Sequence, residues 1–214
     1  MSLKTFYNKN LLEVGVDEAG RGPLFGRVYA GAVIMPQEEN YDATLIKDSK
    51  KLSERKRLMA YDYIKEYAID YSVAYVEASE IDTINILKAT MKAMHTALDE
   101  MTVRFDHILV DGTYFKTYIE ETGEFIPYTC IEKGDNAYTN IAAASIMAKV
   151  SRDEYIKDLC KKYPKLDEYY NLGSNKGYGA KVHMEGIREH GITNMHRQSF
   201  NPCSHSDIVM ELEL

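Results

Sequence analysis

The chain has 214 residues, 45% hydrophobic and 28% charged, so it can bury a sizeable core and does not have the composition of a disordered protein. Its net charge of −7 argues against a uniformly basic nucleic-acid binder but leaves room for local basic patches. The three cysteines are widely spaced and form no CxxC pair, which disfavours a disulfide framework and a structural zinc site. No apolar run reaches the ~18 residues of a membrane span, and the N-terminus has no apolar signal region, so we expect a soluble cytoplasmic protein.

The first part of the chain predicts a hairpin followed by a helix and a further strand. Residues 11–16 and 27–35 have the composition of strands, and the stretch GRGPLFG between them predicts the connecting turn. Ser53 is placed to cap a helix, and residues 70–78 predict a third strand. The apolar face of that helix is formed by Leu58, Tyr61, Ile64 and Ala68.

The segment 79–101 has the clearest helical pattern in the chain. Ser79 with Asp82 three residues later resembles a capping box, with Asp in place of the usual Glu or Gln. Its apolar residues step by three or four and predict one buried stripe, which we interpret as ordinary core: Ile81, Ile84, Leu87, Met91, Met94, Leu98 and Met101.

Two short strands and a long helix are predicted next. Residues 105–112 predict a buried strand that ends on Asp111, and residues 125–131 predict a strand that leads into the polar turn EKGDN. Residues 141–163 predict a helix whose first turns consist of small residues. Small side chains allow a helix to approach a sheet closely, so we expect this helix to pack against the strands.

Strands that alternate with helices after an opening hairpin predict an α/β fold with a sheet of mixed strand direction. Beyond Pro164 the chain is rich in Gly, Asn, His and Lys and has short helical pieces at best. We therefore expect a core over residues 1–163 and a C-terminal helical or loop extension over residues 164–214, packed as part of one domain.

Acidic residues end apolar strands or begin helices at three places. Asp17 and Glu18 form an adjacent pair, Asp111 ends the stretch LVDG, and Asp135 lies in KGDN. Acids at the ends of separate strands can converge at one edge of an open sheet. Neighbouring strand residues face opposite ways, so both acids of the pair can serve one site only if the strand breaks there, which the glycines after it would permit.

Four like charges close together repel one another and demand cations. Carboxylate oxygens without His or Cys select Mg²⁺ or Mn²⁺, and two such ions about 4 Å apart could clamp a phosphodiester. The alternative is that each acid is only a helix cap or a turn residue, because Asp-Gly and Asp-Asn are common turn dipeptides.

These residues resemble the ribonuclease HII family, the type 2 ribonucleases H, and the resemblance covers nearly the whole chain. It implies a ribonuclease H-like mixed sheet flanked by helices and an endonuclease that hydrolyses RNA in RNA/DNA hybrids and nicks duplex DNA at embedded ribonucleotides. The blocks that carry it are GVDEAGRGPLFG (15–26), DSKKLSERKR (48–57), IDTINILKATMKAM (81–94), LVDG (109–112), KGD (133–135), AAASIMAKVSRD (142–153), NKGYGAKVH (175–183) and HRQSF (196–200).

The resemblance places the catalytic, metal-binding acids at Asp17, Glu18, Asp111 and Asp135. It implies hydrolysis with two divalent cations, Mg²⁺ or Mn²⁺, that leaves 3′-hydroxyl and 5′-phosphate ends. Asp153 lies in a matching block and competes with Asp135 as the fourth ligand. We prefer Asp135, because Asp153 sits inside a predicted helix and would pair there with Arg152 or Lys157 at the surface.

The turn formed by Gly20, Arg21 and Gly22 is the predicted sensor of the ribose. Glycines let backbone groups approach a sugar closely, and a 2′-hydroxyl both donates and accepts hydrogen bonds. The resemblance assigns this turn to that hydroxyl, with the phenol of Tyr178 completing the recognition. The related ribonuclease HIII carries a different residue in place of Arg21 and has an extra N-terminal domain, so HII is the better match. A mere hairpin would explain the glycines but not their position beside the acid pair.

Basic residues are the expected contacts with the phosphates of the duplex. Lys50, Lys149 and Lys176 lie inside the matching blocks and are preferred. Any other single lysine is more simply part of a solvated face. The further candidates are Lys47, Lys51, Arg55, Lys56, Arg57, Lys161, Lys162, Lys165, Lys181, Arg188 and Arg197.

Several points stay open from the sequence. Phe25 and Arg27 stand where smaller or less polar residues are expected and could alter substrate geometry, and the spacing of His183, His190 and His196 suits surface or packing residues better than zinc ligands. We expect a monomer that binds RNA/DNA hybrids and ribonucleotide-containing DNA. A DNA-directed nuclease of the same superfold, such as a junction resolvase, and a non-catalytic nucleic-acid binder are the alternatives.

Overall fold

The structure is a computed structural model that describes residues 3–37, 43–46 and 52–213. The chain divides into two compact units, which we describe separately. The sheet unit comprises Met1–Ala19, Tyr29–Tyr75 and Met91–Val150, and the C-terminal unit comprises Gly20–Val28, Val76–Thr90 and Ser151–Leu214. Over the described residues, no helix is long and apolar enough to cross a membrane.

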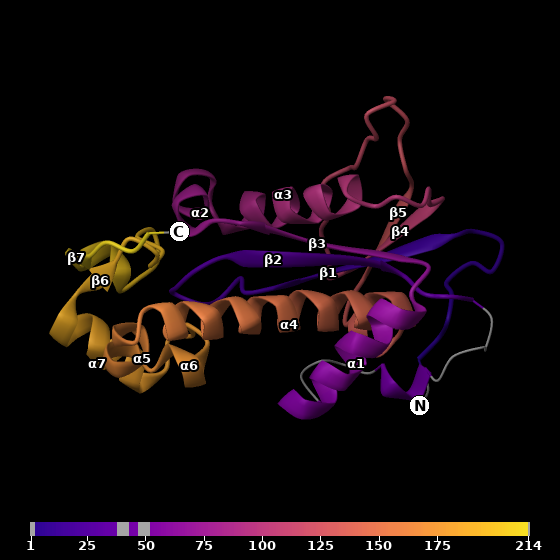
Figure 1. The fold of residues 1–214 in the computed structure, drawn as a ribbon. Helices are drawn as coiled ribbons and strands as arrows, with labels where there is room; N and C mark the ends of the chain where they lie inside the picture. The colour runs from indigo at the N-terminus through magenta and orange to yellow at the C-terminus, as the bar shows by residue number, and fades with distance from the viewer. Residues whose placement is uncertain (1–2, 38–42, 47–51, 214) are drawn as a thin grey trace. The chain divides into compact units, whose positions relative to one another are not determined.

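A sheet of five strands, counted over the described residues, has the order β3-β2-β1-β4-β5 (Figure 1). The central strand β1 (Glu13–Ala19) pairs antiparallel with β2 (Val28–Ile34) and parallel with β4 (His107–Asp111). The strand β5 (Tyr128–Ile131) pairs parallel with β4, and β3 (Asp70–Val76) lies beyond β2. The sheet therefore has mixed strand direction, as predicted.

Helices cover both faces of this sheet. In the sheet unit, α1 (Glu54–Tyr67) and the first half of α4 (Thr139–Lys162) lie on one face, and α3 (Ile86–Asp99) runs along the other (Figure 1). A buried apolar cluster joins β2 to α1 and α4, with Val33, Ile64 and Met147 among its members. The predicted α/β class is thus confirmed.

Two glycines in the strands allow α4 to lie very close to the sheet, as the small residues of its first turns predicted. A Cβ atom added to Gly15 would lie 2.2 Å from the backbone carbon of Asn140, and one on Gly31 would lie 2.5 Å from the carbonyl oxygen of Ala144. Neither backbone atom can move without shifting the helix. The side chain of Asn140 also bonds the sheet, because its Nδ2 donates to the Glu13 carbonyl at 2.6 Å and its Oδ1 accepts from the Met35 N–H at 3.0 Å.

The C-terminal unit is built from short elements. They are α2 (Ala78–Ile84), α5 (Lys165–Tyr170), α6 (Leu172–Asn175), α7 (Lys181–His190), β6 (Ile192–Thr193) and β7 (Ile208–Met210). Three single 3-10 turns, Ala43–Leu45, Gly134–Asn136 and Cys203–His205, complete the assigned helices of the described chain.

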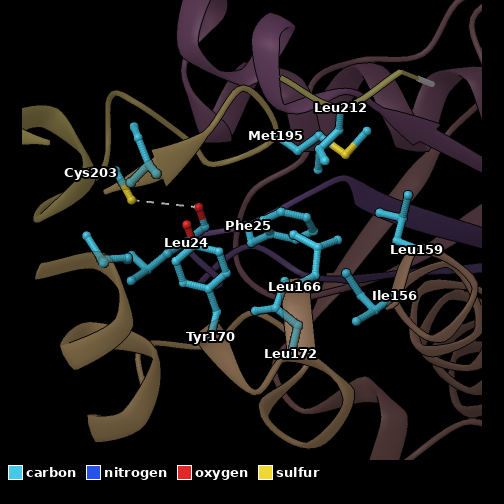
Figure 2. Close-up of a cluster of buried hydrophobic side chains, with 12 residues drawn as sticks. Leu24, Phe25, Ile156, Leu159, Leu166, Tyr170, Leu172, Met195, Cys203 and Leu212 are labelled. Carbon is cyan, nitrogen blue, oxygen red and sulfur yellow. Dashed lines mark hydrogen bonds between the residues drawn. The ribbon is translucent and has the colours of Figure 1, made fainter. Parts of the chain in front are cut away.

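The core of this unit gathers around residues of the predicted turn. Leu24 and Phe25 lie among side chains from α4, α5 and α6, with Tyr170 and Met195 beside them (Figure 2). Phe25 is completely buried, and the Cys203 thiol donates to the Leu24 carbonyl at 3.9 Å. The stretch GRGPLFG after the acid pair is therefore held in the core by Leu24 and Phe25.

The predicted helical signals are partly right. Ser53 caps α1 and accepts from the Lys56 N–H at 3.4 Å, and the predicted face of α1 packs into the core. The continuous helix predicted over 79–101 is wrong, because Asn85 at φ 70° separates α2 from α3. Leu87 of the predicted buried stripe is 44% exposed.

The capping box at Ser79 is wrong as well, since Glu77 is the N-cap of α2 and Ser79 lies inside the helix. The carboxylate of Asp82 instead accepts from the backbone N–H groups of Gln198 and Ser199 at 2.9 and 2.8 Å. A long-range contact has replaced the local cap.

Candidate active site

Asp17 lies near the end of β1 in an environment that disfavours its charge. Burial raises its pKa well above the usual value, and the neighbouring carboxylates of Glu18 and Asp111 raise it further. Hydrogen bonds from the Ser145 side chain and from the Glu18 N–H, the latter at 2.7 Å, partly offset this effect. The structure thus brings three of the four predicted acids within electrostatic reach of one another.

The strand does not break at the acid pair. β1 continues through Asp17 and Glu18, with Glu18 opposite Ala30 and Ala19 opposite Tyr29 on β2, and the chain turns only at Gly20, where φ is +95°. The break considered at this pair is therefore displaced to the next glycine, while the carboxylates still interact electrostatically.

Asp111 and Asp135 are joined through the backbone. Val16 pairs with Val110 in the parallel register of β1 and β4, so Asp111 ends β4 level with Asp17. The Gly134 N–H donates to Asp111 Oδ1 at 2.7 Å, which holds the 3-10 turn containing Asp135 against the end of the strand. Asp135 is buried, and its Oδ1 accepts from Asn136 Nδ2 at 2.9 Å.

The chemistry of these groups suits a hard divalent cation, because their donors are carboxylate oxygens and their mutual repulsion would be relieved by positive charge. Among the residues that the structure describes, no set of three or more His, Cys, Asp or Glu side chains is already arranged to hold a metal ion. The assignment of Asp17, Glu18, Asp111 and Asp135 as ligands therefore stays a prediction.

Sequence reasoning missed Ser145 and misplaced Asp153. Ser145 is buried on α4, and the sequence signal for it is a polar residue within the alanine-rich start of this helix. Asp153 belongs to the C-terminal unit and is 7% exposed, so its expected place at the helix surface is wrong. Its expected partner Lys157 pairs with Glu154 at 2.8 Å.

The predicted sugar-contacting turn lies in the C-terminal unit together with Tyr178. Arg21, Gly22 and Tyr178 are exposed, and the ring carbon Cε1 of Tyr178 lies 3.8 Å from the position of a Cβ added to Gly22. The Leu24 N–H donates to the Gly177 carbonyl at 2.8 Å, which joins the turn to the loop that carries the tyrosine. The structure thus brings these predicted residues together.

Two buried arginines hold the backbone of this region. Arg197 donates to carbonyl groups of the turn, and Arg152 donates to the Phe25 carbonyl at 3.1 Å and the Lys176 carbonyl at 2.9 Å. Burial and the nearby charge of Arg152 lower the pKa of Arg197 to about 9, so its guanidinium remains charged at neutral pH. Arg197 is 0% exposed, and its expected role as a phosphate contact is wrong.

A buried pair of histidines lies behind Tyr178. His183 Nδ1 lies 2.9 Å from the Tyr178 carbonyl and must donate to it, so its Nε2 is the acceptor in the 3.1 Å contact with His196 Nε2. His196 then donates through Nε2 and accepts at Nδ1 from the Thr193 N–H at 3.0 Å. The partners therefore fix opposite tautomers. Both rings are fully buried, which agrees with the expected packing role.

This pair is expected to make the protein sensitive to acid. Burial lowers the pKa of both imidazoles, and proximity to His183 lowers the pKa of His196 further. At these two sites the unfolded chain therefore binds more protons than the folded chain below pH about 6.5, so the contribution of the pair to the free energy of unfolding should fall as the pH drops below that value. Chemical denaturation at a series of pH values between 8 and 5 measures how the free energy of unfolding depends on pH.

The tautomers of the two rings can be checked directly. ¹⁵N spectra of the imidazoles at neutral pH should show Nδ1–H for His183 and Nε2–H for His196. Two Nε2–H rings would contradict the assignment.

The remaining predicted residues have mixed outcomes. Lys50 lies outside the described residues, as do Lys47 and Lys51, whereas Lys149 and Lys176 are partly exposed on α4 and at the end of α6. Their contacts with phosphates stay predictions.

Phe25 and Arg27, the two unusual residues beside Gly26, face the protein. Phe25 is completely buried and packs edge-on against His196, with a distance of 5.0 Å between ring centroids. Arg27 pairs with Glu77 at 2.6 Å and lies 4.4 Å from the ring centroid of Tyr155. These contacts explain both residues through packing within the C-terminal unit.

A known family matches this chain over most of its length. The family model described as Ribonuclease HII matches residues 14–203. The chain belongs to the ribonuclease HII family. Ribonuclease HII of Phocaeicola vulgatus is 46% identical over 199 residues, covering 93% of this chain and 94% of that protein. Ribonuclease HII of Parabacteroides distasonis is 48% identical over 190 residues, covering 88% of this chain and 89% of that protein.

A solved structure supports the same conclusion. The crystal structure of ribonuclease H2 from Pyrococcus horikoshii OT3 has a TM-score of 0.70 at 25% identity and covers 90% of this chain and 95% of that chain. The resemblance and the fold class predicted from the sequence are confirmed, and the chain is an endonuclease of the ribonuclease H type that acts on nucleic acid. Family membership favours this activity over a junction resolvase or a non-catalytic binder.

Proposed function

We propose that this ribonuclease HII family member nicks duplex DNA on the 5′ side of embedded ribonucleotides and cuts the RNA strand of RNA/DNA hybrids. Water attacks the phosphorus and the bond to the 3′ oxygen breaks, which leaves a 3′-hydroxyl and a 5′-phosphate. The proposed specificity for ribonucleotides rests on one observation, which is that Gly22 and the Tyr178 ring lie next to each other and are both exposed. A backbone without side chains beside a phenol offers donors and acceptors to a 2′-hydroxyl.

Asp17, Glu18, Asp111 and Asp135 are the proposed holders of two divalent cations, Mg²⁺ or Mn²⁺. When bound, such ions activate water and stabilise the leaving oxygen. The chain itself orients the carboxylates: the Ser145 side chain bonds Asp17, and the Gly134 N–H bonds Asp111. These bonds support the proposal because they fix two acids from neighbouring strands before any ion arrives.

Recognition of the substrate is proposed to divide between two kinds of contact. The turn Gly20–Gly22 and Tyr178 contact the ribose, while Lys50, Lys149 and Lys176 contact phosphates without reading sequence. In the chain, the turn follows the acid pair after only Ala19, so residues of both proposed roles are covalent neighbours. A monomer suffices for this division of roles.

Two DNA duplexes that differ by a single 2′-hydroxyl test the proposal. We expect cutting on the 5′ side of the ribonucleotide in Mg²⁺ or Mn²⁺ and no cutting of the all-DNA duplex. Mapping of both product ends gives the position and the end chemistry. Equal cutting of the two duplexes would instead indicate a DNA-directed nuclease, and tight binding without product in either metal would indicate a non-catalytic binder.

A further inference from the structure

The backbone carbonyl groups of residues 20–27 converge on one buried side chain, the guanidinium of Arg197. A guanidinium has five N–H donors, and all five are used here. Nε donates to Gly26 at 2.9 Å, Nη1 to Arg21 at 3.0 Å and Pro23 at 2.8 Å, and Nη2 to Gly20 at 2.6 Å and Arg27 at 3.0 Å. The segment 20–27 is thus folded around the rigid, planar guanidinium of Arg197.

We infer that Arg197 is a positioning residue, which fixes the turn Gly20–Gly22 in the conformation that contacts the ribose. The inference rests on the proposed function of that turn. A glycine-rich segment has many accessible conformations, and ordering it costs conformational entropy. Arg197 meets this cost in the folded protein before any substrate binds, because its bonds reach the carbonyls of both Gly20 and Arg21.

Arg197 is itself held from several sides. Its N–H donates to the Leu24 carbonyl at 2.8 Å, and the Gly26 N–H donates to the Met195 carbonyl at 2.9 Å. The following residues are bound by Asp82, which accepts from the N–H groups of Gln198 and Ser199. Leu24 is also embedded in the apolar core of the unit (Figure 2). The backbone that carries the Arg197 side chain is therefore held in place.

The same arrangement links the turn to Tyr178. Arg152 donates to the carbonyls of Phe25 and Arg27, which follow the turn, and to that of Lys176 in the loop that carries Tyr178. Its guanidinium carbon lies 5.9 Å from the centroid of the Tyr178 ring. Buried groups thus fix the backbone of the turn relative to the phenol ring. A substitution at Arg197 should therefore change how much the Tyr178 phenol contributes to cutting.

Lysine is the informative replacement, because it keeps the charge but presents three donors on one nitrogen and cannot span five carbonyls. We expect Arg197→Lys to lower kcat on a duplex with one ribonucleotide about tenfold and to change KM less than twofold. We also expect Tyr178→Phe to lower kcat only about tenfold in the Arg197→Lys background, against about a hundredfold in the wild-type protein, since a misplaced turn uses the phenol only in part.

Ile187→Ala is the matched control, since it removes a buried side chain of the same apolar core and leaves the hydrogen bonds from Arg197 to the carbonyls of Gly20 and Arg21 in place. It should lower Tm while leaving kcat and the effect of Tyr178→Phe unchanged. If Arg197→Lys does not fold, Asp82→Asn is the milder variant, because it weakens the bonds to the N–H groups of the residues that follow Arg197. It should also lower kcat and reduce the effect of Tyr178→Phe. The inference would be overturned if Arg197→Lys lowered Tm but left unchanged both kcat and the drop in kcat caused by Tyr178→Phe.

The proposed function and this inference fail in different ways. If the wild-type protein cuts the all-DNA and ribonucleotide duplexes equally, the proposed function fails whatever Arg197 does. If the wild-type protein discriminates and the Arg197→Lys protein shows the same kcat and the same dependence on Tyr178, only the inference fails.

Discussion

Replacing Asp17 with asparagine is expected to reduce cutting of a ribonucleotide-containing duplex about a thousandfold, or ~4 kcal/mol, and at the same time to stabilise the protein without metal. Activity should fall because the substitution removes a charged oxygen ligand. Stability should rise because burial and two neighbouring carboxylates make the Asp17 charge unfavourable in the folded state. Asparagine keeps an oxygen that can accept the hydrogen bonds from Glu18 and Ser145.

The sign of the pH dependence follows from the same environment. The pKa of Asp17 is raised by burial and by Glu18 and Asp111, so the folded state holds this proton to higher pH than the unfolded state does. The group therefore destabilises the folded protein above its folded-state pKa, and this penalty disappears as the pH falls through that value. The stabilisation by Asp17→Asn should accordingly be largest at neutral and alkaline pH.

Two measurements check this prediction. Thermal unfolding in EDTA should give a higher Tm for Asp17→Asn than for the wild-type protein, and added Mn²⁺ should raise the Tm of the wild-type protein more. Glu13→Gln, on the same strand, is the matched control, because Glu13 is buried but accepts the N–H groups of Tyr7 and Asn8 at 2.7 and 2.8 Å. That variant should lose stability and keep its cutting rate. Full activity in Asp17→Asn would refute the role of Asp17 as a metal ligand.

The sequence predicted those features that depend on local patterns. Apolar runs located the strands, and acids at the ends of two of them, Asp17 and Asp111, lie on neighbouring parallel strands. Small residues in the first turns of α4 correctly indicated a close approach of helix and sheet, whereas the part that Gly15 and Gly31 play in it is seen only in the structure. In each case the pattern of side chains along one segment determines its structure.

Features that depend on distant partners could not be predicted in this way. Asn85 interrupts a helical stripe that is continuous in sequence. Asp82, placed by its spacing in a local cap, accepts instead from the N–H groups of residues 198 and 199. The positive charge of Arg197 led to the prediction of a phosphate contact. Its side chain is instead buried, because carbonyl groups of residues 20–27 accept from all its N–H donors. Charge alone does not distinguish a surface arginine from one that organises backbone.

The phenol of Tyr178 gives the second large effect. We expect Tyr178→Phe to lower kcat on a duplex with one ribonucleotide about a hundredfold, or ~2.7 kcal/mol, because a polar contact to the ribose is lost in a closed complex. Folding should be unaffected, since the side chain is 45% exposed. Tyr67→Phe, at the exposed end of α1, is the control and should change neither rate nor Tm. An unchanged rate in Tyr178→Phe would remove this residue from the recognition of the ribose.

Gly22→Ala separates recognition by the backbone from recognition by the phenol. Alanine at Gly20 would strain the turn, because φ is +95° and the new Cβ would lie 2.3 Å from Arg152 Nε. At Gly22 the new Cβ would be in ordinary contact with the Tyr178 ring at 3.8 Å, so the protein should fold normally. The added methyl group nevertheless occupies exposed space beside the backbone that the sugar must approach. A normal Tm with impaired cutting would therefore support close backbone contact with the ribose, and a normal cutting rate would show that the ribose does not approach this glycine.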